Sequence, residues 1–538
     1  MSSPARPPET VRDLLLARAG DDRPGLLAGE LRWSWREYVE RADERAASLA
    51  RHLHADRPRH VGVLLDNTPE MALQLAAAGL GGHVLVGLNT TRRGAALAAD
   101  IRKADVQLVV VEDAHAALLT GLDLPDVRVV HAQELSPPSA EGAAVTVSPD
   151  GPVPETDAAP GLDDLFMLIF TSGTSGDPKA VRVTHGKITG PAAYMTGRLG
   201  LTADDVHYVS MPLFHSNGVM AGWSTALHTG AAIALAERFS ASGFLPDVRR
   251  YGATYANYVG KPLSYVLATP ERPDDAENPL RLVFGNEAGD RATAEFARRF
   301  GCRVIDGFGS TENAVVISRT PDTPPGSLGQ PMPGVAVLDP QTHEECPPAV
   351  FDEHGQVTNL DACVGELVNT TGSGQFAGYY NDEAATAERL RDGKYWSGDL
   401  AYRDAAGWLY YAGRTADWLR VDGENIAAAP VERILTRHPA ISEAAVYAVP
   451  DPASGDQLVA ALVLTGDLSP DDFEAFLAGQ PDLGQKQWPR YVRLMTMLPR
   501  TATNKVLKRE LQAAGLAGLA GLSSGATWTR DERGTTYR

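Results

Sequence analysis

The chain has 538 residues, enough for several domain-sized units, and its composition of 43% hydrophobic and 22% charged residues is ordinary for a globular enzyme. Its formal net charge of −19 at pH 7 makes nucleic acid a poor partner, because a strongly negative surface repels polyanions. The 3 cysteines lie far apart without metal-ligand spacing, so we expect neither a disulfide framework nor structural zinc.

The first half of the chain alternates between helical and strand-like segments. The N-terminus shows no apolar core followed by a cleavage site, so we expect no signal peptide and a cytoplasmic protein. Residues 9–55 read as helices around a short apolar turn. Buried strands are then predicted at 60–67, 83–89, 106–113, 165–170, 280–286 and 302–309, with helices that include 68–82, 92–104 and 290–300. This alternation is typical of βαβ units and a mostly parallel sheet.

Residues 206–236 form an uncharged stretch, with no Asp, Glu, Lys or Arg. The stretch contains several histidines, glycines and hydroxyl side chains, which make a bilayer span unfavourable. We therefore expect no transmembrane segment, and we interpret the stretch as a buried helix and strand beside a pocket.

The pattern changes toward the C-terminus. Residues 325–412 have the Gly, Pro and aromatic spacing of a β-rich region, whereas residues 416–510 read as a small α+β unit. Residues 513–526 are of low complexity and are predicted to be a loose tail or a weak helix. The sequence thus predicts an α/β fold, with parallel sheets and a β-rich subdomain in a large N-terminal region and a small α+β domain at the C-terminus.

A loop rich in glycine and hydroxyl groups follows the predicted strand 165–170. Its sequence is Thr171-Ser172-Gly173-Thr174-Ser175-Gly176-Asp177-Pro178-Lys179. Glycines let backbone N–H groups approach an anion closely, and the hydroxyl groups add hydrogen-bond donors. The spacing to Lys179 differs from that of GxxxxGK[ST], so this is not an ordinary P-loop. A flexible turn is the alternative, but the strand before the loop and the lysine after it favour phosphate binding.

Five segments, in order, resemble the adenylate-forming superfamily, which contains acyl-CoA synthetases, peptide-synthetase adenylation domains and firefly luciferase. TSGTSGDPK (171–179) resembles its phosphate loop. FGSTE (308–312) resembles its aromatic-Gly-x-Thr-Glu motif, and YWSGDLAYRDAAGWLYYAGR (395–414) resembles its ribose-binding motif and hinge. VDGENIAAAPVE (421–432) resembles the start of its C-terminal domain, and PRTATNKVLKREL (499–511) resembles its catalytic-lysine segment. Further segments, such as YVGKPLSYVL (258–267) and FGNEA (284–288), resemble most closely the fatty-acid-transport or very-long-chain acyl-CoA synthetase branch.

The resemblance implies a site for ATP and Mg²⁺. Phe308 offers a flat face on which adenine can stack, and Glu312 is a hard oxygen ligand suited to Mg²⁺. Asp399 would accept hydrogen bonds from the ribose hydroxyls, and Arg414 would bind the same sugar or a phosphate. The implied ATP-binding set is Thr171, Ser172, Gly173, Thr174, Ser175, Gly176, Lys179, Gly285, Asn286, Glu287, Asp306, Gly307, Phe308, Asp399 and Arg414, with Thr171 and Glu312 as metal ligands.

The resemblance also implies catalytic and substrate-binding roles. Lys505 would stabilise charge on the α-phosphate and the attacking oxygen during adenylation. The further catalytic candidates are His215, Thr311 and Glu312, and the candidate substrate pocket comprises His215, Tyr258, Lys261 and Gly309. His215 could instead be an ordinary core histidine, and Lys261 could meet a polar substrate or solvent. The small residues Gly218, Ala221, Gly222 and Ser224 would either admit a long chain or belong to a tightly packed helix.

The expected domains are an N-terminal adenylation core, 1–415, and a mobile C-terminal lid, 416–538, that carries Lys505, with the active site in the cleft between them. Two positions depart from the family pattern. Asn504 stands where a glycine usually precedes the catalytic lysine, and Ala416, followed by Asp417, stands at the usual charged hinge position. These positions, like the Gly423 segment on the thiol side, serve the second half-reaction in relatives.

The function that the resemblance implies is an ATP-dependent ligase that activates a carboxylic acid as its AMP anhydride, releases pyrophosphate and then transfers the acyl group to CoA. One alternative is an adenylating enzyme with another acceptor, such as an amine or a carrier protein, including nitrite activation for diazotisation of an aromatic amine in specialised metabolism. The other is a non-catalytic nucleotide-binding regulator. The expected partners are a small-molecule acid and a small-molecule acceptor, and a homodimer is compatible with the sequence.

Overall fold

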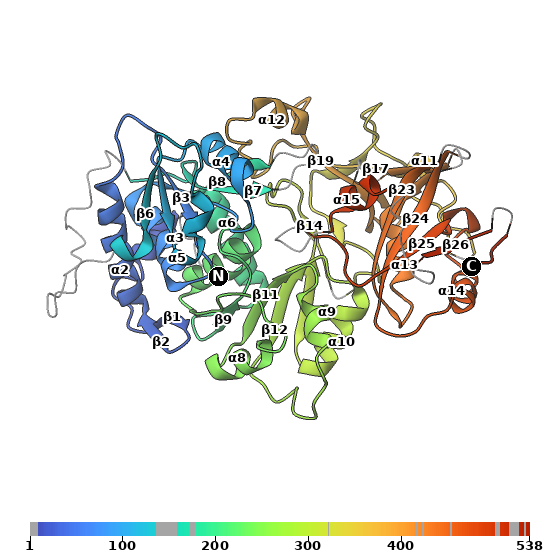
Figure 1. The fold of residues 1–538 in the computed structure, drawn as a ribbon, viewed down its shortest axis with the longest axis horizontal. Helices are drawn as coiled ribbons and strands as arrows, with labels where there is room; N and C mark the ends of the chain where they lie inside the picture. Colours follow the sequence, from blue (N-terminus) through green and yellow to red (C-terminus); the bar gives the residue numbers. More distant parts are fainter. Residues whose placement is uncertain are drawn as a thin grey trace, which may run out of the picture. The chain divides into compact units, whose positions relative to one another are not determined.

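The computed structural model describes residues 9–135, 159–171, 178–320, 322–353, 355–414, 418–421, 424–451, 455–500, 506–515, 527–531 and 534–538 (Figure 1). The fold is mixed α/β with parallel sheets and a separate β-rich part, as the sequence predicts. Two compact units divide the chain. The first comprises Met1–Ala288, Ala292–Asp306 and Gln375–Ala387, and the second comprises Gly289–Arg291, Gly307–Gly374 and Glu388–Arg538. The domain boundary expected between residues 415 and 416 stays a prediction.

A six-stranded sheet in the first unit carries the strand before the predicted phosphate loop. Its strands, in spatial order, are β6 (Arg128–His131), β5 (Leu108–Val111), β3 (His60–Leu64), β4 (Val84–Gly87), β7 (Leu165–Thr171) and β8 (Lys179–Thr184). All neighbours pair in parallel except β7 and β8, which are antiparallel. Every residue of β3 and β5 is buried, and apart from His60 at the start of β3 both strands are apolar, as expected for parallel strands covered on both faces.

The second sheet has seven strands. In spatial order they are β13 (Arg303–Gly307), β12 (Leu282–Asn286), β11 (Tyr255–Val259), β9 (Val206–Val209), β10 (Ala232–Leu235), β1 (Pro24–Ala28) and β2 (Leu31–Ser34). The apolar turn expected within residues 9–55 is therefore wrong in part, because β1 and β2 pair there as antiparallel strands. Local apolarity does not distinguish a turn from a short strand whose partner, β10, lies some 200 residues further along the chain.

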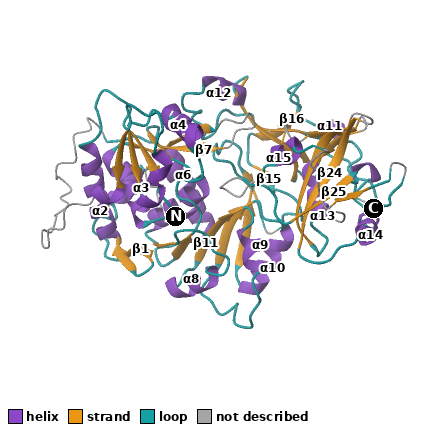
Figure 2. Ribbon diagram, in the orientation of Figure 1, coloured by secondary structure: helices purple, strands orange, loops and turns teal. Residues whose placement is uncertain are grey.

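Helices flank the parallel strands (Figure 2). Those that lie wholly or mostly in the first unit are α1 (Val11–Leu16), α2 (Trp35–Ala50), α3 (Pro69–Gly81), α4 (Gly94–Lys103), α5 (Asp113–Ala116), α6 (His185–Leu199), α7 (Ser224–Thr229), α8 (Phe244–Tyr251), α9 (Pro262–Leu267), α10 (Asp290–Phe300) and α12 (Glu383–Arg389). The uncharged stretch 206–236 contains β9, a π-helix at Asn217–Trp223, α7 and β10, and most of it is buried. In the described part of the chain, no helix is long and apolar enough to cross a membrane.

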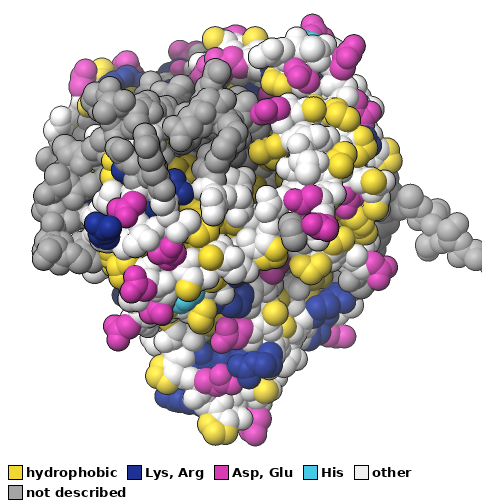
Figure 3. Space-filling view, turned by 90° about the vertical axis from the view of Figure 1, so that its right-hand side faces the viewer, with side chains coloured by type: hydrophobic (Ala, Val, Ile, Leu, Met, Phe, Trp, Pro, Cys, Tyr) yellow, Lys and Arg dark blue, Asp and Glu magenta, His cyan; other side chains and the backbone are white. Residues whose placement is uncertain are grey.

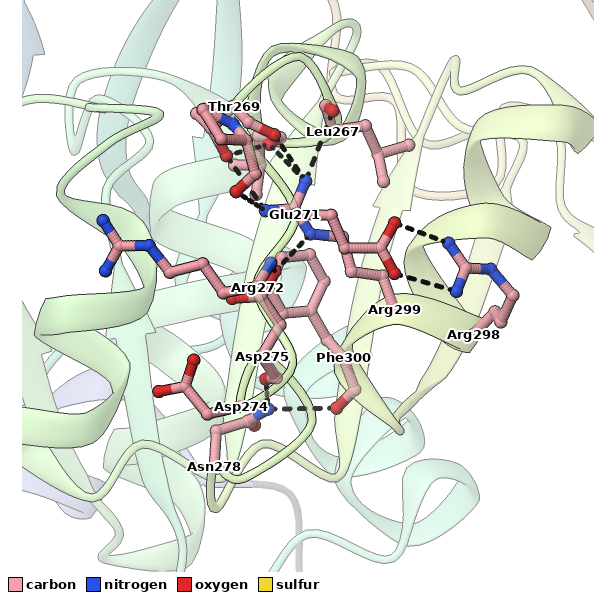
Figure 4. Close-up of polar contacts among 12 residues, drawn as sticks. Leu267, Thr269, Glu271, Arg272, Asp274, Asp275, Asn278, Arg298, Arg299 and Phe300 are labelled. Carbon is pink, nitrogen blue, oxygen red and sulfur yellow. Dashed lines mark hydrogen bonds and ion pairs between the residues drawn. The ribbon is translucent and has the colours of Figure 1, made fainter.

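A buried arginine fixes the loop that follows α9 (Figure 4). Arg299 Nε donates to Asp275 Oδ2 at 2.6 Å, and the two side chains are 5% and 3% exposed. The remaining guanidinium nitrogens donate to carbonyl oxygens of Val266, Leu267, Thr269 and Pro270 and to the Thr269 hydroxyl. This residue thereby ties α10 to the end of α9, whose last carbonyls have no partner within the helix.

The second unit is built mainly from antiparallel strands. One sheet comprises β16 (Val335–Leu338), β17 (Gly365–Asn369), β19 (Lys394–Arg403), β18 (Leu390–Arg391) and β20 (Leu409–Arg414), and another comprises β23 (Ile441–Asp451), β24 (Gly455–Leu464), β25 (Tyr491–Met495) and β26 (Thr527–Thr529). Two small pairs are β14 (Ile317–Ser318) with β15 (Gln330–Pro331) and β21 (Trp418–Val421) with β22 (Glu424–Ala427).

In the described part of this unit, the α-helices that accompany these sheets are α11 (Leu360–Cys363), α13 (Ala428–Leu435), α14 (Pro470–Ala478) and α15 (Lys508–Ala513). A hydrophobic core that includes Phe473, Trp488 and Trp528 joins α13 and α14 to the sheet of β23–β26. This packing confirms the α+β character expected for this part of the chain, whereas its separation as a domain stays a prediction. On the face of the molecule in Figure 3, basic side chains lie among acidic ones.

Candidate active site

The two ends of the predicted phosphate loop lie side by side in the first unit. Thr171, the last residue of β7, pairs with Lys179, the first residue of β8, and its hydroxyl donates to the Lys179 carbonyl at 3.4 Å. Lys179 is buried. Ser172, Gly173, Thr174, Ser175 and Gly176 lie outside the described residues. The structure therefore joins the strand and the lysine from which phosphate binding was predicted.

Three further predicted residues meet at the ends of β11, β12 and β13. Tyr258 pairs with Gly285, where a Cβ atom would collide with the Tyr258 carbonyl oxygen, so the close approach requires glycine. The Tyr258 hydroxyl donates to Asp306 Oδ2 at 2.6 Å, and the backbone N–H of Ala288 donates to the same oxygen at 2.9 Å. Between them, Asn286 ends β12 and Glu287 has φ 68°, a left-handed conformation that is uncommon for this residue type and concentrates at functional sites.

His215 lies in a turn that the side chain of Asn67 supports. The Asn67 side chain donates to the Met211 carbonyl and accepts from the Leu213 N–H, both at 2.8 Å. His215 itself is half-buried. Sequence reasoning missed Asn67, although a polar residue just after the buried strand β3 is a signal that points to the carboxyl edge of a parallel sheet.

The π-helix after His215 packs tightly. A Cβ atom at Gly218 would collide with the Pro212 carbonyl oxygen, and one at Gly222 would lie 3.0 Å from Asn257 Oδ1. Asn217, at the start of the π-helix, donates to the Tyr258 carbonyl at 3.0 Å and accepts from Asn257 at 2.6 Å. Of the two interpretations of these small residues, the structure favours a packed helix at Gly218 and Gly222.

The predicted base and ribose residues cluster in the second unit. Asp399 pairs with Arg414 across β19 and β20, and Arg414 Nε donates to Asp399 Oδ1 at 3.1 Å. Tyr411, which sequence reasoning missed, donates its hydroxyl to the same oxygen at 3.5 Å. The Tyr411 ring lies 6.3 Å from the Phe308 ring. An aromatic face, a buried carboxylate and a guanidinium are thus within one cluster, and an aromatic face and a carboxylate are groups that can stack on a base and accept hydrogen bonds from sugar hydroxyls.

For the remaining predicted residues, the structure gives the degree of burial or the unit to which they belong. Thr311 is buried, Glu312 and Lys261 are half-buried, and Gly309 is exposed. Thr171 belongs to the first unit and Glu312 to the second. Among the described residues, no group of three or more His, Cys, Asp or Glu is arranged to hold a metal ion. The candidates Ala416, Asp417, Gly423 and Lys505 lie outside the described residues, as does Asn504.

Glu366 supports the part of β19 that carries Asp399, where the pairing of β17 with β19 shifts register. One of its carboxylate oxygens accepts from the Gly398 N–H at 2.6 Å, and the Asp399 N–H donates to Ser397 Oγ at 3.1 Å. Gly398 has φ 75°, which favours glycine. Burial raises the pKa of Glu366, although the Gly398 N–H and the nearby Arg391 act in the opposite direction.

Replacing Glu366 by alanine should raise the KM for ATP by about tenfold or more, because the half-buried Gly398 N–H beside Asp399 loses a charged acceptor worth about 1.5–3 kcal/mol. Glu366→Gln is the matched control, since its amide oxygen can still accept from Gly398. Steady-state kinetics with varied ATP would check this. Equal KM values for Glu366→Ala and the unmodified protein would show that β19 holds Asp399 in place without Glu366.

Comparisons with known proteins identify the class to which this arrangement belongs. The model of the AMP-binding enzyme family matches residues 16–380, and that of the AMP-binding enzyme C-terminal domain matches residues 430–505. The fold and the matches define an AMP-forming ligase of the acyl-CoA synthetase type. The chain belongs to the AMP-binding enzyme family, which confirms the resemblance inferred from the sequence.

Similar proteins span nearly the whole chain. A medium/long-chain-fatty-acid–CoA ligase, FadD17, of Mycobacterium marinum is 54% identical over 94% of this chain and 96% of its own length. A steroid-22-oyl-CoA synthetase of Rhodococcus jostii is 48% identical over 94% of this chain and 90% of its own. Among solved structures, o-succinylbenzoate CoA synthetase from Bacillus subtilis with its acyl-adenylate intermediate superposes with a TM-score of 0.76 at 25% identity, covering 93% and 97% of the two chains.

Proposed function

We propose that the chain forms CoA thioesters of a large, mainly apolar carboxylic acid, of the long-chain fatty acid or steroid side-chain acid class. The observation that carries this proposal is the 54% and 48% identity, over almost the whole chain, to two ligases named for such acids. Acid and ATP give acyl-AMP and pyrophosphate, and CoA then displaces AMP from the acyl group.

In this proposal the chain's own residues bind and orient the nucleotide. Phe308 and Tyr411 contact the adenine, and Asp399 accepts hydrogen bonds from the ribose hydroxyls while Arg414 holds the carboxylate in place. Lys179 balances negative charge on the phosphates, and Lys505 stabilises the charge that develops as the acid attacks the α-phosphate. The support for these proposed roles is the geometry of the Asp399–Arg414–Tyr411 cluster and the position of Lys179 at the end of the predicted phosphate loop.

The donor types at Thr171 and Glu312 fit Mg²⁺, which prefers hard oxygen ligands. This ion is usually held by one or two carboxylates together with substrate phosphates, so the finding that the described residues form no larger acidic group is compatible with it. Bound there, Mg²⁺ would neutralise charge on the phosphates. On this proposal Glu312 contributes a carboxylate oxygen and Thr171 a hydroxyl.

Glu312→Gln should therefore weaken Mg²⁺-dependent turnover, because the amide keeps the shape of the side chain and removes the charge of the ligand. We expect a higher Mg²⁺ concentration at half-maximal rate and a lower maximal rate, measured as pyrophosphate release over a Mg²⁺ titration. Glu344→Gln is a control for loss of one charge, since Glu344 is exposed. An unchanged titration for Glu312→Gln would mean that Glu312 has a structural role.

The proposed function is tested with purified protein and a panel of acids. Long-chain fatty acids and steroid side-chain acids are compared with small polar acids, each with and without CoA, and with an aromatic amine as a second acceptor. Pyrophosphate release and acyl-CoA formation are measured in parallel. The expected result is CoA thioester formation on the apolar acids, and the panel then separates fatty from steroid substrates. Faster turnover of polar acids, or equal turnover without CoA, would contradict the proposal and favour another acceptor.

A further inference from the structure

A segment far along the chain extends the sheet that carries Lys179. Residues 375–387 belong to the first unit. Within this segment Tyr379 forms an antiparallel bridge with Val181 of β8, and the Tyr380 N–H donates to the Ala180 carbonyl at 2.8 Å. Because β8 is the last strand of its sheet, the segment lies along an edge that would otherwise be open.

The ring of Tyr379 faces the ammonium group of Lys179. The Lys179 Nζ atom lies 5.2 Å from the ring centroid, and both residues are buried, with 6% exposure for Lys179 and 5% for Tyr379. A buried ammonium group is costly unless other groups compensate for its lost hydration, and the negative face of an aromatic ring is such a group. The Phe376 ring meets the Tyr379 ring edge-on at 5.0 Å, which fixes its orientation.

A second contact holds the residue just before this lysine. Lys103, at the end of α4, donates to the Pro178 carbonyl at 3.2 Å and to Asp382 Oδ2 at 2.7 Å. The hydrogen bond from Lys103 lowers the pKa of Asp382, and the charge of Lys179 acts in the same direction. The segment 375–387 therefore acts on two neighbouring residues. Its Asp382 binds Lys103, which in turn binds the Pro178 carbonyl, and its Tyr379 contacts Lys179 directly.

We propose that Tyr379 is a positioning residue that orients the phosphate-binding ammonium of Lys179 through a cation–π contact. Unlike a carboxylate, an aromatic ring attracts the ammonium without neutralising its charge, so the charge stays available to an anionic ligand. The Lys103–Asp382 pair fixes the backbone at Pro178 and thereby limits the position of the neighbouring Lys179 Cα atom, from which the side chain extends. This inference rests on the proposed role of Lys179 in binding ATP phosphates.

The test varies the charge on the ring face and keeps the size of the ring nearly constant. Phenylalanine and its 4-fluoro, 3,5-difluoro and 3,4,5-trifluoro derivatives are placed at position 379, and kcat and KM for ATP are measured by pyrophosphate release. Each fluorine weakens the attraction between ring and cation. We expect kcat/KM for ATP to fall progressively along the series, by about tenfold from phenylalanine to the trifluoro derivative. A merely structural ring would give no such gradient.

Two controls separate the possible outcomes. The same series at Tyr380, whose ring lies 5.8 Å from the Arg182 guanidinium, should leave the KM for ATP without a gradient. The series at Tyr379 in a Lys179→Met background should also be flat, because the cation is gone.

If Lys179→Met alone leaves the KM for ATP unchanged, the proposed role of Lys179 fails. If Lys179→Met impairs ATP use but the series at position 379 is flat, or if its gradient persists without Lys179, the positioning role of Tyr379 is overturned.

Discussion

Lys505→Ala is expected to lower the rate of adenylate formation by about 10²–10³-fold or more, the effect of removing one preorganised group that stabilises charge in the transition state. Lys505 lies outside the described residues, so the expectation rests on its position in the PRTATNK segment. ATP binding should change far less, because the phosphate and ribose residues remain. Single-turnover pyrophosphate release and equilibrium binding of ATP measure the two effects separately.

Lys508 provides a matched control for this prediction. It lies three residues further along the same segment, and its ammonium group pairs with Glu432 at 2.8 Å. Lys508→Ala removes the same charge from the same segment, and we expect it to change the adenylation rate by less than about threefold, because a single partly exposed ion pair contributes little. Comparable losses for the two variants would indicate a general effect of charge or folding. Near-normal adenylation by Lys505→Ala would contradict its catalytic assignment.

The second large effect concerns stability. Arg299→Met should destabilise the first unit by about 3–5 kcal/mol, because it leaves the buried Asp275 carboxylate without its partner. The same substitution removes the donors to the carbonyls of Val266, Leu267, Thr269 and Pro270. Denaturant unfolding, followed by tryptophan fluorescence and compared among variants of the whole protein, would measure the shift in midpoint.

Arg298→Met is the natural comparison, since Arg298 is adjacent in sequence but forms an exposed ion pair with Glu271 (Figure 4). We expect its midpoint to change much less. A double variant, Arg299→Met with Asp275→Leu, should be more stable than Arg299→Met alone, because neither charge is then left buried and unpaired. A double variant that is less stable than the single one would show that Asp275 stabilises the fold through its other contact, the hydrogen bond that it accepts from the Arg272 N–H, and would contradict the ion-pair explanation.

Much of the fold could be predicted because its signals are local. The buried parallel strands β3 and β5 are apolar apart from His60 at the start of β3, and α10 matches the predicted helix 290–300. The family resemblance, which rests on short ordered motifs, is confirmed by the match over residues 16–380. Glycine and hydroxyl residues at the end of a strand predict a phosphate-binding loop between Thr171 and Lys179; the structure describes the two ends of this segment, and the binding role stays a prediction.

What the sequence did not reveal depends on contacts between distant segments. Tyr411 joins Asp399 through a pairing of β19 with β20, and Asn67 reaches a turn that lies more than 140 residues further along the chain. Neither residue belongs to a pattern with a fixed period. The π-helix after His215 was also missed, because its extra residue per turn breaks the 3.6-residue period by which helices are recognised.

The strand-like contact of Tyr379 and Tyr380 with β8 has a practical consequence for producing parts of this protein. A fragment that ends at Gly374 would keep all six strands of the sheet and would lose the segment that covers its last edge. An uncovered edge strand offers unpaired N–H and C=O groups to other chains, which promotes aggregation. The boundary of a soluble fragment therefore has to be chosen by which backbone covers β8 rather than by where the last strand of the sheet ends.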